Sequence, residues 1–150
     1  MKQIISTLLL LLSIPVCVMA QGWNESEYKQ IERSIRMPEF PNKSFSIKQF
    51  GAKVNASAAA NQKAINRAIS TCSAKGGGTV VIPAGTWNTG ALRMKSHVNL
   101  HLEEGATLLF AFQPELYPMV KTSWEGLGCW NYSPCIYAYE ETDVAITGKG

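Results

Sequence analysis

The chain has 150 residues, 46% of them hydrophobic, and a formal net charge of +3. This length and apolar content allow one domain with a buried core, and they exclude a chain that is disordered because of its composition. The basic residues are dispersed and no run of Lys and Arg alternates with aromatic residues, so the sequence predicts no nucleic-acid partner.

Residues 1–20 have the pattern of a secretory signal peptide. Lys2 gives a positive start, residues 4–18 form an apolar stretch of about the length of a signal core, and Val18-Met19-Ala20 supplies the cleavage positions. We expect the mature chain to begin near Gln21, to be secreted or periplasmic, and not to remain inserted in a membrane. A single-span anchor is the alternative, although the apolar run is short for a bilayer.

Residues 21–44 are polar and are interpreted as an N-terminal lead-in with a short helix over 25–35. The first strand is predicted over 45–50, because apolar and polar residues alternate there with period two and Gly51 follows. The main body of the chain is therefore expected to run from residue 45 to residue 150.

Residues 61–74 form the strongest helix pattern in the sequence. Asn61 can cap its start and Gly76 can end it. The apolar residues repeat at helical spacing and fall on one face: Ala64, Ile65, Ala68, Ile69 and Cys72. Such a face covers other apolar groups, so Cys72 is interpreted as a small core residue.

The glycines at 76–78 end this helix, and a β-branched run over 79–82 predicts a buried strand directly after them. Further short strands are expected at 86–90, 91–94, 98–102, 106–110, 136–139 and 144–146. Short strands with turn-rich separators favour a solenoid of stacked coils. Residues 98–100 and 144–146 look like the same position about two coils apart. A β-sandwich is the competing fold, but it needs hairpin signals such as Asn-Gly, and none occurs.

Three cysteines remain once the signal peptide has removed Cys17, so at most one disulfide can form within the chain. Cys129 and Cys135 can close a small loop in an oxidising compartment, or they can stay as two unpaired thiols. No histidine lies near them and no second pair exists, so we expect no metal site.

The order of these segments closely resembles the N-terminal coils of glycoside hydrolase family 28, the polygalacturonases of the pectate-lyase-like superfamily. The resemblance rests on FSIKQFGA from Phe45, AINRAI from Ala64, GGGTVVIPAGTWNTGAL from Gly76, SHVNLHLEEGATLL from Ser96, WEG from Trp124, and SPCIYAYEETDVAITGKG from Ser133. It implies a mainly β fold, a right-handed parallel β-helix whose N-terminal end is capped by the helix at about 61–74. It also implies inverting hydrolysis of galacturonosyl linkages in pectic polysaccharide or oligogalacturonides, without a cofactor, by a protein that is monomeric at full length.

The catalytic motifs of that family do not occur in this chain. The resemblance places the two catalytic aspartates in Asn-x-Asp and Asp-Asp motifs, joined by Gly-His-Gly and Arg-x-Lys. Here the single aspartate, Asp143, is interpreted as a turn residue. The adjacent Glu103 and Glu104 point to opposite sides of an extended chain and precede a glycine, so they are not a catalytic pair. We therefore expect the catalytic residues downstream of Gly150, and this fragment alone to be inactive.

The insertion over 114–134 is the longest segment without a predicted strand, and long loops on solenoids tend to lie on the binding face. Trp124, Trp130 and Tyr132 can stack on sugar rings, Lys121 can pair with a uronate carboxylate, and Glu125 can bind sugar hydroxyls. The alternative is that the aromatic rings pack the loop onto the coils. A β-helical carbohydrate-binding or adhesive module is the second hypothesis for the whole protein. A lyase that holds calcium with clustered carboxylates is the third, and the chain offers no such cluster.

Overall fold

The structure is a computed structural model, and it describes residues 24–150. The predicted signal peptide lies outside the described residues. No helix in the described part of the chain is long and apolar enough to cross a membrane. The chain divides into two compact units at Met37–Pro38, so that residues 38–43 group with the main body.

The described part of the first unit is the helix α2 (Glu25–Ser34), which confirms the short helix predicted in the lead-in. Asn24 caps it, because its side-chain oxygen accepts a hydrogen bond from the Ser26 backbone N–H at 3.0 Å. Lys29 pairs with Glu25 one turn earlier at 2.8 Å. None of its residues is buried, so packing adds little to its stability.

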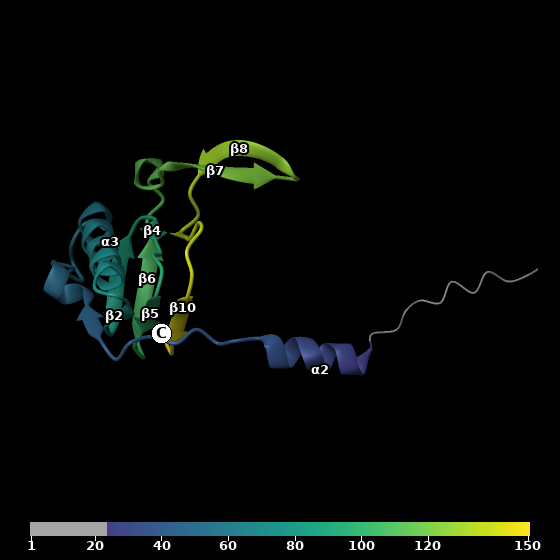
Figure 1. The fold of residues 1–150 in the computed structure, drawn as a ribbon. Helices are drawn as coiled ribbons and strands as arrows, with labels where there is room; N and C mark the ends of the chain where they lie inside the picture. The colour runs from purple at the N-terminus through teal and green to yellow at the C-terminus, as the bar shows by residue number, and fades with distance from the viewer. Residues whose placement is uncertain (1–23) are drawn as a thin grey trace, which may run out of the picture. The chain divides into compact units, whose positions relative to one another are not determined.

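The second unit consists mainly of short strands that pair in parallel in three sheets, together with one antiparallel pair described below. Figure 1 shows strands of these parallel sheets side by side. The first sheet has the order β1-β2-β5-β10, and β3 pairs with β6 and β4 with β9. The bounds are β1 (Ser44–Ser46), β2 (Gly78–Ile82), β3 (Gly85–Thr89), β4 (Leu92–Arg93), β5 (Val98–Leu102), β6 (Ala106–Phe110), β9 (Ile136–Tyr137) and β10 (Val144–Gly148). β2, β3 and β4 form one coil, and β5, β6 and β9 stack on them, which confirms the mainly β, parallel architecture and contradicts a sandwich.

The pairing of β5 with β10 confirms one predicted repeat and corrects its spacing. Val98 lies opposite Val144, and Leu100 opposite Ile146, so the two segments occupy the same position in the coil. They are hydrogen-bonded neighbours, however, and therefore one coil apart where two were predicted. The chain between them contains an inserted hairpin, described below, which lengthens a single coil.

The long helix α3 (Ala58–Ala74) begins three residues before the predicted start. Ser57 is the cap, accepting from the Ala60 N–H at 3.3 Å. Asn61 is fully buried instead, and its amide binds the backbone N–H and carbonyl of Lys53, both at 2.9 Å. The predicted end is correct, because Gly76 and Gly77 donate hydrogen bonds to the carbonyls of the last turn.

The strand predicted over 45–50 is wrong beyond Ser46. Only β1 pairs with β2, and the chain then forms the 3-10 helix η1 (Ile47–Phe50). Gly51, at a φ of 95°, closes this turn with a hydrogen bond to the Lys48 carbonyl. The turn places Ile47 entirely inside the core, which period-two alternation alone does not indicate.

The core lies between α3 and the stacked strands. Alternate residues of β2 and β5 point inward, as their burial shows, and Cys72 is buried as predicted. The fully buried side chains include Ile47, Ile65, Ile69, Val80, Ile82, Trp87, Leu92, Val98 and Leu100. Burial raises the pKa of the Cys72 thiol above its ordinary value, so this thiol stays protonated and unreactive.

The insertion is a β-hairpin, where the sequence predicted no strand. It follows the 3-10 helix η2 (Pro114–Leu116) and consists of β7 (Met119–Trp124) paired antiparallel with β8 (Leu127–Tyr132). Glu125 and Gly126 form the two-residue turn with φ of 48° and 84°, the signs of a type I′ turn. In Figure 1 the hairpin stands away from the parallel sheets.

Candidate functional site

The single aspartate of the chain, Asp143, lies at a corner of the coil, directly before a strand. Asp143 and His97 occupy equivalent positions, directly before the paired Val144 and Val98. Both have positive φ, 49° and 63°, and the His97 Nδ1 lies 3.1 Å from an Asp143 carboxylate oxygen. This confirms Asp143 as a turn residue. No group of three or more His, Cys, Asp or Glu side chains in residues 24–150 could hold a metal ion.

Glu141 connects two successive coils through hydrogen bonds. One carboxylate oxygen accepts from Lys95 Nζ at 2.8 Å, and the other accepts from the backbone N–H and hydroxyl of Ser96 at 2.8 and 2.7 Å. The hydrogen bonds from Lys95 and then Ser96 outweigh partial burial and lower the pKa of Glu141 from 4.5 to about 2. The carboxylate is therefore structural and stays ionised down to low pH.

Glu141→Gln is expected to lower the free energy of unfolding at pH 7 by about 2 kcal/mol. A pKa shift of this size corresponds to at most about 3 kcal/mol, and the one-third exposure of Lys95 reduces it. Because the folded pKa is the lower one, the stabilisation is complete above pH 4.5 and disappears as pH falls towards 2. Urea unfolding at several pH values measures this. A deficit that stays constant from pH 7 to pH 2 would contradict it.

The hairpin has two faces, because alternate residues of a strand point to opposite sides. We name them by one residue each. The lysine face consists of Met119, Lys121, Ser123, Gly128, Trp130 and Tyr132, and the leucine face of Val120, Thr122, Trp124, Leu127, Cys129 and Asn131. Most of these side chains are exposed on both faces, with Trp124 at 68% and Trp130 at 67%.

The structure separates the predicted substrate-binding residues. Lys121 lies on the lysine face, directly opposite Trp130 in the strand register. Trp124 lies on the leucine face opposite Leu127, and Glu125 belongs to the turn. One sugar chain on one face therefore cannot contact Lys121 and Trp124 together. The exposure of both tryptophans also shows that they do not pack the insertion onto the coils.

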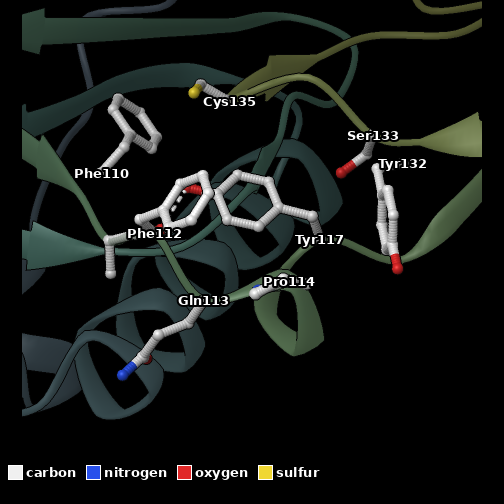
Figure 2. A pocket seen from close by; sticks show the side chains of 9 residues that line it. Phe110, Phe112, Gln113, Pro114, Tyr117, Tyr132, Ser133 and Cys135 are labelled. Atoms are coloured by element: carbon white, nitrogen blue, oxygen red, sulfur yellow. Dashed lines mark hydrogen bonds between the residues drawn. The ribbon is translucent and has the colours of Figure 1, made fainter.

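A cavity of about 510 Å³ lies beside the base of the hairpin (Figure 2). Phe110 at the end of β6, Phe112 and Pro114 form one part of its lining, and Tyr132 and Cys135 form another. Most of this lining is apolar or aromatic. The segments that form it lie about twenty residues apart in the chain, one before the hairpin and one after it.

Tyr117 and Ser133 provide the polar groups of this cavity. The Tyr117 hydroxyl donates to the Ala111 carbonyl at 2.8 Å, the dashed line in Figure 2. Burial, with the nearby Cys135 thiol, raises the pKa of Tyr117 above its ordinary value. Ser133 is 6% exposed, and its Oγ is the only buried side-chain oxygen or nitrogen of the described chain without a hydrogen-bond partner.

The three described cysteines are free thiols, so the structure does not contain the disulfide considered for Cys129 and Cys135. Cys129 is half-buried within β8, and Cys135 is exposed beyond it, after Ser133 and Pro134. Chemically, the region offers aromatic rings, one ammonium group and one unpaired hydroxyl. Groups of this kind are able to bind a polyol by stacking and hydrogen bonding, and they do not form an acid–base pair. Sequence reasoning missed Phe112, Tyr117 and Ser133, whose only signal was the aromatic density around the insertion.

Two curated proteins share sequence with this chain. It is 32% identical over 96 residues to a Vitis vinifera protein named "Probable polygalacturonase", and the match covers 59% of this chain and 20% of that protein. It is 41% identical over 76 residues to the exo-poly-α-D-galacturonosidase of Dickeya chrysanthemi, covering 51% of this chain and 12% of that protein. No protein-family profile matches the chain.

Two solved structures share its fold. The exopolygalacturonase of Thermotoga maritima superposes with a TM-score of 0.75 and 34% identity, over 83% of this chain and 28% of that one. The family 28 exopolygalacturonase of Yersinia enterocolitica superposes with a TM-score of 0.63 and 31% identity, over 72% of this chain and 20% of that one. The chain thus spans 12–28% of the length of these four proteins. The predicted resemblance to the N-terminal part of the polygalacturonase family is confirmed.

Proposed function

We propose that this chain is the N-terminal part of a secreted or periplasmic glycoside hydrolase that cleaves galacturonosyl linkages in pectic polysaccharide with inversion. One observation carries the proposal: 83% of the chain superposes on an exopolygalacturonase with a TM-score of 0.75 at 34% identity. A shared fold alone does not imply a shared function. The 34% sequence identity over the same succession of short parallel strands is what supports the proposed activity.

In this proposal α3 closes the N-terminal end of a right-handed β-helix. A solenoid needs a cap there, since its first coil has no neighbour on one side. Buried residues of α3 face the coil, while Gln62 donates to the carbonyls of Ala91 and Leu116 at 3.0 and 2.6 Å. Asn66 donates to the Ala91 carbonyl and accepts from the Arg93 N–H. The helix thus supplies hydrogen-bond partners to the Ala91 carbonyl and the Arg93 N–H, and a second partner to the Leu116 carbonyl, which also accepts from the Ala91 N–H.

The catalytic residues are proposed to lie beyond Gly150. Inversion requires one carboxylic acid to protonate the leaving oxygen and a second carboxylate to activate water from the opposite side. In the described residues, Glu141 is held in a coil contact and Asp143 in a corner. This part of the chain then supplies the cap, the register of the first coils and a surface that can bind substrate.

The test compares two proteins, the complete gene product and residues 21–150 alone, on polygalacturonate. The complete protein is expected to release reducing ends of inverted anomeric configuration in the presence of a calcium chelator, and the short protein none. Unsaturated, calcium-dependent products would indicate a lyase instead. Binding without any cleavage would contradict the proposal and favour a carbohydrate-binding or adhesive module.

A further inference from the structure

We propose that the lysine face of the β7–β8 hairpin and the cavity at its base form one binding surface for an acidic oligosaccharide, a short chain of uronic acid units. The identity of the sugar rests on the proposed function. The position of the surface rests on the structure alone. Tyr132 connects its two parts, because it belongs to the lysine face and also lines the cavity.

The aromatic part of the surface is Trp130 and Tyr132. They stand at alternate positions of β8, so both rings emerge on the same side, about 7 Å apart along the strand. Their side chains are 67% and 57% exposed. Large rings exposed together on one face indicate a binding surface, and the flat apolar side of a pyranose stacks on such rings.

The charge of the surface selects an acidic sugar. Lys121 lies opposite Trp130 in the register and is the only charged residue on the lysine face. Its exposed ammonium group can pair with a carboxylate on a sugar stacked over the neighbouring ring. The leucine face carries an equally exposed tryptophan, Trp124, but no charged residue.

The cavity supplies the polar contact that a sugar needs. Its volume of about 510 Å³ lies within the range of small-ligand sites. Figure 2 shows the Ser133 hydroxyl directed to the space between Tyr117 and Tyr132. A buried hydroxyl without a partner is unfavourable, and a ligand hydroxyl can complete its hydrogen bonding.

The test uses the complete protein and a thio-linked trigalacturonate, whose sulfur bridges resist hydrolysis, in calorimetric titrations. Trp130→Ala and Tyr132→Ala are each expected to weaken binding about tenfold, through loss of stacking. Trp124→Ala is the matched control, since it removes the same side chain at the same exposure from the other face, and it should change binding less than twofold. Unchanged binding by Trp130→Ala, or an equal loss by Trp124→Ala, would overturn the proposal.

Charge and hydroxyl are tested separately. Lys121→Gln should weaken binding of the acidic probe about fivefold and remove part of its salt dependence, while leaving a neutral thio-linked galactotriose unaffected. Ser133→Ala should weaken binding of both probes. Equal effects of Lys121→Gln on both probes would refute an acidic ligand. If the variants change the affinity for the acidic probe as expected but the complete protein releases no reducing ends from polygalacturonate, the proposed function fails and this inference stands. If it hydrolyses normally and Trp130→Ala binds normally, only this inference fails.

Discussion

Gly77→Ala is expected to lower the free energy of unfolding by more than about 3 kcal/mol, from two independent costs. Gly77 has a φ of 94°, which an alanine adopts only with strain. A Cβ at this position would also lie 2.4 Å from the His97 carbonyl oxygen and 2.6 Å from its Cβ. These atoms belong to the backbone and the stiff base of a side chain, so they cannot move away cheaply.

Gly76→Ala separates the two costs. Its φ of 86° is nearly the same, but the only atom near an added Cβ is the flexible end of Lys43, 4.0 Å away. This variant should lose only about 1 kcal/mol. Urea unfolding of both variants, followed by fluorescence, measures the difference. Equal losses would show that close approach of the two coils at Gly77 is not what requires glycine.

The corner that contains Gly77 repeats in each coil. The register places Gly77, His97 and Asp143 at equivalent positions before β2, β5 and β10. The later two are not glycines, although both have positive φ, and they contact each other through their side chains. Their polar side chains tolerate this conformation better than apolar ones. At this corner, the coil that begins with β2 therefore requires a glycine, whereas the coils that begin with β5 and β10 are joined by a contact between two side chains.

The strands that the sequence predicts well are those with a local signal. Residues 98–102 and 106–110 match β5 and β6 at both ends, because apolar alternation stops there at turn residues on each side. The start of α3 and the end of β1 were wrong for a different reason. Asn61 binds Lys53 across a loop, and Ile47 is drawn into the core beneath a helix. These are tertiary contacts, which override local propensity.

The candidate site was less predictable than the fold. The insertion lacks Asn-Gly, so its sequence does not indicate the Glu125-Gly126 turn or the strands whose side chains alternate on each side of it. The sequence therefore predicts one site for Lys121 and Trp124, although they lie on opposite faces of the hairpin. The cavity joins residues before and after the hairpin, such as Phe112 and Ser133, and no periodicity in the sequence relates them.

Trp87→Ala is expected to lower the free energy of unfolding by about 4 kcal/mol, since it removes the largest fully buried side chain of the described core and leaves a cavity. The indole Nε1 also donates to the Pro83 carbonyl at 2.8 Å, which would be left without its partner, and Lys48 lies 5.9 Å from the ring centre.

Trp87→Phe keeps most of the burial and should lose only about 2 kcal/mol. Trp87 lies opposite Leu108 in the pairing of β3 with β6, and β6 ends at Phe110 beside the cavity. Trp87→Ala should therefore speed amide exchange in β6 more than in β10, and hydrogen exchange of the folded protein measures this difference. Uniform acceleration over both strands would mean that Trp87 supports the whole stack and not this sheet in particular.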